Sequence, residues 1–191
     1  GRGFSGQVAF TPDGTLGLAA QDDGSVGIFS VATDGSIEVV EAAYDPGFYA
    51  VAVVADPSGE AAWVVDGNWV ENGGGIYRFS LDCETGAPGE AERVVEAKLP
   101  IGWLSTRQRL DHWVLAGWEV PGADASAEAH LFEAGEVPAL LGSDEAFGDD
   151  EALLSAAALT FDDDLLLIAD YSPWSGIDNR VAALYLDSAG P

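Results

Sequence analysis

The chain has 191 residues, of which 48% are hydrophobic, and its 33 Asp and Glu residues against 7 Lys and Arg give a formal net charge of -26 at pH 7. That apolar content is ample for a buried core, whereas the charge repels phosphate backbones and anionic membrane surfaces, so we expect no nucleic-acid partner. No apolar run approaches the roughly 18 to 20 residues that span a bilayer, so we expect no membrane insertion.

The first part of the chain predicts four short strands joined by tight turns. The predicted strands are Gln7–Phe10, Leu16–Gln21, Ser25–Val31 and Ile37–Ala42. Pro12-Asp13-Gly14, Asp23-Gly24 and Asp34-Gly35 separate them, and these residue types favour tight reversals. The pattern is therefore that of a four-stranded antiparallel meander.

The same pattern recurs three more times along the chain. The predicted strands are Tyr49–Ala55, Ala61–Asp66, Gly75–Leu81 and Glu92–Ala97, then Trp103–Thr106, His112–Trp118, Ala127–Phe132 and Val137–Leu141, and finally Leu153–Phe161, Leu165–Asp170 and Arg180–Leu186. A helix competes with a strand at 145–159, where Ala and Leu are dense and Asp149-Asp150 could cap a helix start.

Aligning the third strand of each repeat places Phe29, Phe79, Phe132 and Tyr185 in register, with a period of about 50 residues. A period of this size built from short strands predicts an all-β fold, a β-propeller of about four four-stranded antiparallel blades. We predict a single propeller domain over residues 1–191, with blades near 4–44, 45–100, 101–145 and 146–191. The last outer strand is missing from this prediction, because only Asp187 to Pro191 follow the third strand of the fourth repeat.

Two segments carry a family resemblance. Residues 10–14 (Phe-Thr-Pro-Asp-Gly), followed by 18–26 and 28–31, resemble one blade of the lactonase-like propellers, the group that includes phosphogluconolactonase-type and YVTN-repeat proteins. Residues 76–82 with Thr85-Gly86 look similar. The resemblance implies a propeller fold, and it also raises a lactonase-like hydrolase acting on a sugar lactone as an alternative function. Members of the group are typically rings of about seven blades.

An arc of about four blades would leave two apolar blade faces in water, and something must cover them. Three arrangements do so: a closed four-bladed ring, two copies meeting head to tail as a homo-oligomer, or a missing segment that completes the ring. We favour a partial ring, either a fragment or half of a larger propeller, with the closed four-bladed ring as the alternative.

The longest irregular segments join the second strand of a blade to the third. They are Gly67–Gly74, Glu119–Ser126 and Tyr171–Asn179, and all such connections emerge on one face of a propeller. Candidate ligand-binding residues in or beside them are Trp69, Trp118, Tyr171, Trp174, Asn68 and Glu119. Aromatic rings beside amides and carboxylates suit a small molecule, a carbohydrate or a protein partner. The alternative is that each Trp packs over the end of its own blade.

Two carboxylates end second strands and are candidate metal ligands. Asp66 and Asp170 occupy this place, with Asp22 equivalent in the first repeat. A repeated carboxylate at the rim of a central channel could coordinate Ca²⁺, which prefers several oxygen ligands. The alternative is local, because an Asp at a strand end also accepts hydrogen bonds from loop amides.

The sequence offers little support for catalysis. His112 and His130 are the only histidines, and no G-x-S-x-G motif presents a serine nucleophile, so we name no catalytic residue. A lactonase would instead need carboxylates or a metal ion, which would involve Asp66, Glu119 or Asp170. We predict a non-catalytic scaffold that binds a ligand or protein, with the lactonase-like hydrolase and a structural module of a larger exported protein as alternatives. An acidic propeller array is typical of an exported bacterial protein, periplasmic or extracellular.

Overall fold

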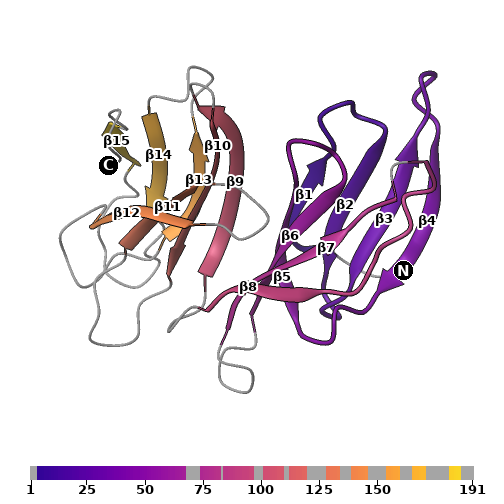
Figure 1. Cartoon of the computed structure of the whole chain (residues 1–191), viewed down its shortest axis with the longest axis horizontal. Helices are drawn as coiled ribbons and strands as arrows, with labels where there is room; N and C mark the ends of the chain where they lie inside the picture. The colour runs from indigo at the N-terminus through magenta and orange to yellow at the C-terminus, as the bar shows by residue number, and fades with distance from the viewer. Residues whose placement is uncertain are drawn as a thin grey trace. The chain divides into compact units, whose positions relative to one another are not determined.

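The computed structural model consists of strands and connecting turns in every part of the chain that it describes (Figure 1). The described residues are 4–67, 74–82, 84–96, 101–109, 112–119, 128–133, 139–145, 154–159, 165–170 and 181–185. The chain divides into two compact units, Gly1–Pro100 and Ile101–Pro191. Within the described ranges, no helix has the length and apolar character needed to cross a membrane.

The first unit holds two four-stranded antiparallel sheets, each with its strands in sequence order. Blade 1 consists of β1 (Phe4–Phe10), β2 (Leu16–Gln21), β3 (Val26–Val31) and β4 (Ile37–Tyr44). Blade 2 consists of β5 (Ala50–Ala55), β6 (Ala61–Asp66), β7 (Gly75–Ser80) and β8 (Glu92–Val95). Each sheet is thus a meander in which neighbouring strands in the chain are neighbours in space.

The second unit repeats this arrangement. Blade 3 consists of β9 (Ile101–Arg109), β10 (His112–Glu119), β11 (Glu128–Glu133) and β12 (Ala139–Glu145). Blade 4 has three described strands, β13 (Leu154–Leu159), β14 (Leu165–Asp170) and β15 (Val181–Tyr185). The all-β propeller fold class is therefore confirmed.

The tight turns form because short polar side chains hydrogen-bond to the backbone two residues further on. Ser25 N–H donates to Asp23 Oδ1 at 3.1 Å, Ser36 N–H to Asp34 Oδ1 at 2.9 Å, and Ser58 N–H to Asp56 Oδ1 at 2.6 Å. The order of strands is as predicted, but several strand ends differ, since β1 begins at Phe4, β4 ends at Tyr44 and β9 spans Ile101–Arg109. The predicted bounds of β2, β6 and β14 match those of the structure.

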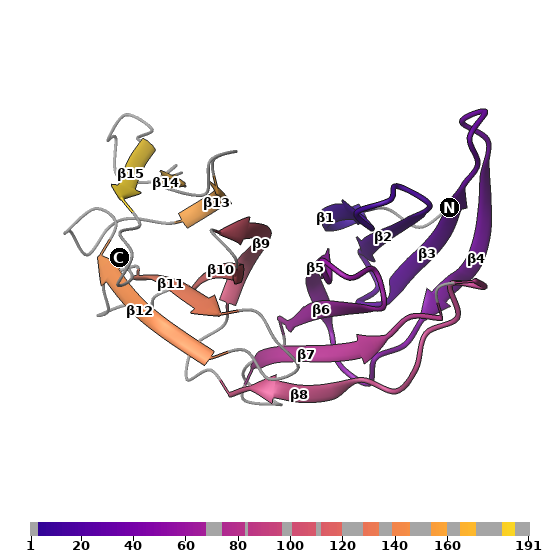
Figure 2. The same cartoon turned by 45° about the horizontal axis from the view of Figure 1, so that its top comes forward.

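The core of the first unit lies between blade 1 and blade 2, whose sheets stack with β5 beside β1 and β2 (Figure 2). Blade 1 contributes Leu18, Ala20, Val26 and Ile28, and blade 2 contributes Val53, Ala55, Ala62, Val64, Phe79 and Leu81. All of these side chains are buried. Fully burying an aliphatic or aromatic side chain contributes about 1.5–3 kcal/mol, so blade stacking is the main source of stability in this unit.

One predicted alignment is shifted by a residue. Phe29 pairs with Gly17, and Phe79 pairs with the equivalent Ala62. In blade 4, Asp170 pairs with Leu154, and the corresponding pair in blade 2 is Asp66 with Ala50. Asp170 and Asp66 are therefore equivalent. Four residues before each of them lie Leu166 and Ala62, which are equivalent as well. The partner of Leu166 is Leu184, whereas Tyr185 pairs with Leu165. Tyr185 therefore lies one residue out of register with the other aromatics, and on a strand one residue changes the face.

The helical alternative at 145–159 is wrong for its described part, because Leu154–Leu159 forms strand β13. Residues 146–153 lie outside the described residues. The single domain over 1–191 and the closure of the ring stay predictions.

Candidate functional site

The proposed binding loops leave and re-enter the sheets at adjacent backbone positions. In blade 2 the connection begins and ends at the pair Asp66 and Gly75. In blades 3 and 4 the last pairs before the connections are Trp118 with Ala129 and Ala169 with Val181. In each of these blades the second and third strands are thus paired neighbours at the end where the connection joins them.

Most of the predicted ligand-binding residues fall outside the described residues. These are Asn68, Trp69, Tyr171 and Trp174. Trp118 and Glu119 are the last two residues of β10, where the structure describes the backbone. Their assignment to a binding face stays a prediction.

In the first unit, the second-to-third connections of blades 1 and 2 begin around one residue, Tyr49. The Tyr49 hydroxyl donates a hydrogen bond to the Asp22 carbonyl at 2.9 Å, and Gly67 N–H donates to the Tyr49 carbonyl at 2.8 Å. Ala50 N–H donates to the Gly24 carbonyl at 2.9 Å. We call this group the Tyr49 rim: 22–24, Tyr49, Ala50, Asp66 and Gly67.

Close packing holds the blade 1 turn against this rim. Gly24 has a φ of +84°, and a Cβ atom built on it would lie 2.6 Å from Tyr49 Cδ2 and 3.1 Å from Tyr49 Cα. Only glycine fits a left-handed turn pressed this closely against a neighbouring backbone. The turn of blade 1 and the start of the blade 2 loop are therefore held in a fixed relation.

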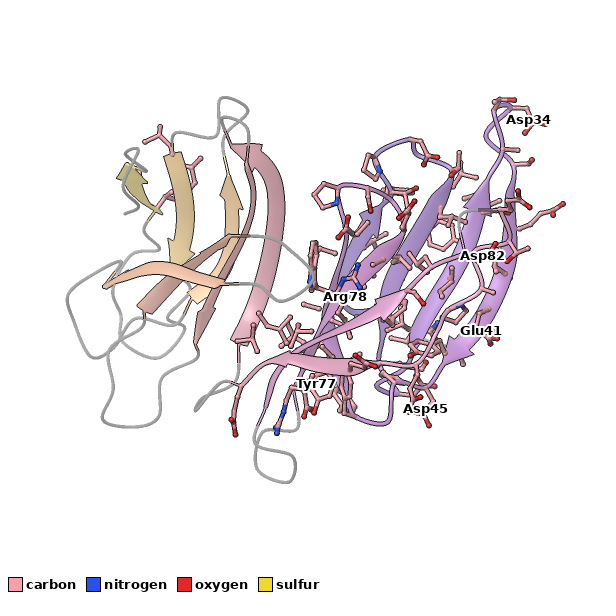
Figure 3. The ribbon with its side chains drawn as sticks, in the orientation of Figure 1. Asp34, Glu41, Asp45, Tyr77, Arg78 and Asp82 are labelled. Atoms are coloured by element: carbon pink, nitrogen blue, oxygen red, sulfur yellow. The ribbon has the colours of Figure 1, made fainter. Side chains whose placement is uncertain are left out.

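Tyr49 is a residue that the sequence analysis placed in a strand and did not assign to the site. Its side chain is 40% exposed, although its hydroxyl and its carbonyl both take part in hydrogen bonds. The preceding Phe48 is half-buried and stacks on Tyr77 with ring centroids 4.0 Å apart. Tyr77 and Arg78 follow one another on β7 and so belong to opposite faces of blade 2 (Figure 3). The signal that could have found Tyr49 is the aromatic pair Phe48-Tyr49 at the start of a predicted first strand.

The proposed metal ligands lie in different units and are considered separately. Asp66 is fully buried at the end of β6, and Asp170 is the last residue of β14, of whose side chain nothing is described. Among the described residues, no group of three or more His, Cys, Asp or Glu side chains could hold a metal ion. Ca²⁺ binding through Asp66 and Asp170 stays a prediction.

The shifted pKa values in the first unit belong to turns and to the core. The Thr11 hydroxyl, followed by the Thr15 amide, lowers the pKa of Asp13, and the Thr85 hydroxyl lowers the pKa of Asp82. Burial, with the charges of Glu90 and Asp45, raises the pKa of Tyr44. Lowered carboxyl pKa values are the wrong direction for a general acid at neutral pH. The carboxylates of Asp13 and Asp82 instead stabilise turns, as does that of Asp34, which lies at the tip of the turn between β3 and β4 (Figure 3).

No family model matches the chain, and no curated protein matches it in sequence. The chain is similar in fold to proteins in three solved structures. A chain in the crystal structure of the mitotic checkpoint complex has a TM-score of 0.54 at 17% identity, and the match covers 94% of this chain and 53% of that chain. A nidogen/laminin complex has a TM-score of 0.59 at 14% identity, with 94% and 58% covered. Sqt1 of Saccharomyces cerevisiae has a TM-score of 0.56 at 10% identity, with 88% and 42% covered.

These neighbours are β-propeller or WD40-like proteins, and the chain spans about half of their length. Identities this low show the fold alone. The propeller fold that the resemblance implies is thus supported, whereas a lactonase-like activity stays a proposal. The chain has the β-propeller fold.

Proposed function

We propose that this protein is a non-catalytic propeller scaffold that binds a ligand or another protein through the loop face formed by its second-to-third strand connections. The observation that carries the proposal is the Tyr49 rim. There the turn of blade 1 and the first residues of the blade 2 loop are hydrogen-bonded to the same residue. A rigid scaffold that presents irregular loops together is the usual basis of a binding site.

The residues carried on these loops suit recognition of a neutral or cationic partner. Asn68 and Trp69 directly follow the Tyr49 rim in sequence. Trp118 and Glu119 end the second strand of blade 3, and Tyr171 and Trp174 follow the second strand of blade 4. Trp and Tyr supply large contact areas at small entropic loss, and neighbouring amides supply hydrogen bonds. The net charge of -26 disfavours anionic partners.

A protein is the partner class we favour. Two of the three similar structures are complexes, the mitotic checkpoint complex and the nidogen/laminin complex. Uncharged carbohydrates and small molecules remain in the test because flat aromatics also stack on sugar rings.

The test measures binding of labelled probes by fluorescence anisotropy. The probes are a set of neutral and Lys-rich peptides and a set of neutral oligosaccharides. We expect Trp69→Ala and Trp174→Ala to weaken any bound probe about tenfold or more, as for a hot-spot aromatic. The matched control is Phe10→Ala, which removes an exposed ring from a sheet face.

Equal losses for Phe10→Ala and the loop variants would refute the loop face. If no probe binds, the structural module of a larger exported protein becomes the better account. An exported location, periplasmic or extracellular, is part of the proposal, and fractionation of the source cells tests it.

The lactonase-like alternative has one supporting observation, the fully buried carboxylate of Asp66 beside the loop. A buried carboxylate at a loop end is a candidate general base. The scaffold proposal expects no hydrolysis of a sugar δ-lactone above the buffer rate. Hydrolysis that Asp66→Asn abolishes, in a variant that keeps the parent's melting temperature, would replace the scaffold by the hydrolase.

The Ca²⁺ proposal has a separate readout. If Asp66 and Asp170 contribute to Ca²⁺ sites, the melting temperature should rise in Ca²⁺ relative to EGTA, because a ligand that binds the folded state stabilises it. Asp66→Asn should reduce that rise, and Mg²⁺ at the same concentration serves as the control for ionic strength. Equal melting temperatures in Ca²⁺ and EGTA would remove the metal proposal.

A further inference from the structure

Blade 1 has an apolar face on the side opposite its core face. A cross-strand row runs over all four strands, in which Phe10 pairs with Gly17, Gly17 with Phe29, and Phe29 with Val39. The Phe29 face, as we call it, comprises Val8, Phe10, Gly17, Phe29, Val31, Ile37 and Val39. Four of its side chains are well exposed: Val8 at 43%, Phe10 at 55%, Ile37 at 64% and Val39 at 70%. Contiguous exposed apolar side chains of this kind mark an interaction surface.

The equivalent face of blade 2 shows what kind of surface packs on such a face. The strand pairings make Phe29 equivalent to Phe79, Gly17 to Ala62 and Phe10 to Ala55. These blade 2 residues are buried in the core against blade 1, at 1% exposure for Phe79 and 0% for Ala62. The face that covers them carries small aliphatic side chains on its second and third strands: Leu18, Ala20, Val26 and Ile28.

Blade 4 carries the counterpart of that covering face. Counting from the strand ends, Leu167 is equivalent to Leu18, and the partner of Leu167 on β15 is Ala183, as Ile28 is the partner of Leu18. Val181 pairs with Ala169 as Val26 pairs with Ala20. Leu167, Val181 and Ala183 form the Val181 face. Val181 is 71% exposed, whereas its equivalent Val26 is 0% exposed.

The Phe29 face and the Val181 face therefore correspond to the two sides of the interface between blades 1 and 2. We propose that two copies of this chain associate head to tail, with the Val181 face of one copy packed on the Phe29 face of the other. The contact is heterologous, so the pair keeps one free Phe29 face on one copy and one free Val181 face on the other, and association continues until a ring closes. This inference uses the sheet faces and is independent of the loop face.

The charge of the chain sets the conditions under which the contact forms. The two faces are apolar, whereas the net charge of -26 makes the copies repel one another at long range. Salt near 0.15 M limits that repulsion to about 8 Å, so association is expected at physiological ionic strength and weakens at low salt.

The experiment is mass determination by light scattering and sedimentation at physiological salt. The parent protein should have a mass of two or more copies. Val39→Asp and Val181→Asp each place a carboxylate on one exposed face position, and each variant alone should be monomeric. Ala87→Asp adds the same charge at an exposed turn between β7 and β8 and should associate like the parent.

Mixing the two variants is the decisive step. Val39→Asp keeps an intact Val181 face and Val181→Asp keeps an intact Phe29 face, so the mixture should form a one-to-one pair that neither variant forms alone. Pair formation also shows that both variants are folded. A monomeric parent would overturn the proposal, as would variants that associate like the parent or a mixture that fails to pair.

Discussion

At the level of single residues, Asp side chains in successive turns accept the same kind of hydrogen bond from the backbone. In the first turn, Asp13 Oδ1 accepts hydrogen bonds from the Thr11 hydroxyl at 2.7 Å and from Thr15 N–H at 3.0 Å. The buried Thr11 hydroxyl in turn accepts from Leu16 N–H at 3.0 Å, which ties the turn to the start of β2. Ionised acceptors make these bonds stronger than neutral ones.

Asp13→Asn should therefore lower the melting temperature at pH 7. The hydrogen bond from the Thr11 hydroxyl is the largest cause of the lowered pKa of Asp13, whose ordinary value is 3.8. A lowered pKa in the folded state means that the stabilisation is present above the ordinary value and is lost as the pH falls through the folded value. The difference between variant and parent should thus shrink in melting curves recorded well below that ordinary value.

The control for charge alone is Glu38→Gln at an exposed position of β4. In a chain of net charge -26, removing a carboxylate without turn contacts should leave the melting temperature unchanged or slightly higher. If Asp13→Asn lowers the melting temperature by the same amount at every pH, the ionised turn contact is not the cause of that loss.

At the level of elements, the stability that a blade face contributes depends on whether another blade packs on it. Phe29 and Phe79 occupy equivalent ladder positions, but Phe79 is buried between blades 1 and 2, whereas Phe29 contacts the exposed Phe10 edge to face, with centroids 6.0 Å apart. The outer strand β4 carries exposed Ile37 and Val39 beside Glu38 and Glu41. Charged residues on an outer strand limit uncontrolled edge pairing while leaving the sheet face available.

Phe79→Ala should lower the free energy of unfolding by about 3–5 kcal/mol, because it opens a cavity between two stacked sheets. Phe29→Ala should cost clearly less in a dilute monomer, because water already reaches its face. Urea denaturation at low protein concentration measures both. Raising the concentration should increase the cost of Phe29→Ala only, if a second copy covers that face. Equal costs under dilute conditions would contradict the assignment of the Phe29 face as open.

At the level of the whole molecule, the charge is the dominant feature. With a formal net charge of -26, like charges crowd together in the folded state more than in the unfolded chain. Among the described residues, the turns concentrate carboxylates such as Asp13, Asp34 and Asp82 at exposed positions. At low ionic strength, repulsion between these carboxylates therefore destabilises the folded state.

The melting temperature should rise as NaCl increases from about 0.01 M to about 0.1 M, because the screening length falls from about 30 Å to about 10 Å over that range. The Val181→Asp variant is the protein for this measurement, so that self-association does not contribute. Sucrose at the same osmolality controls for general solute exclusion. A melting temperature that does not respond to NaCl would show that repulsion between carboxylates is not limiting.

The sequence by itself determined the strands and the turns, because both depend on neighbours within a few residues. Short apolar runs bounded by turn residues predicted β2, β6 and β14 to the residue, whereas the ends of β1, β4 and β9 differ from those predicted. The convergence of loops on a common face followed from the repeat and stays a proposal for Trp69, Trp118 and their counterparts.

Only the tertiary structure decided which of two equivalent residues is buried. Phe29 and Phe79 are the same amino acid in the same ladder position, and the presence or absence of a stacked blade makes the difference. The register of Tyr185 and the role of Tyr49 were also beyond the sequence. Both depend on hydrogen bonds between strands or turns that are far apart in the chain, and periodicity does not encode such contacts.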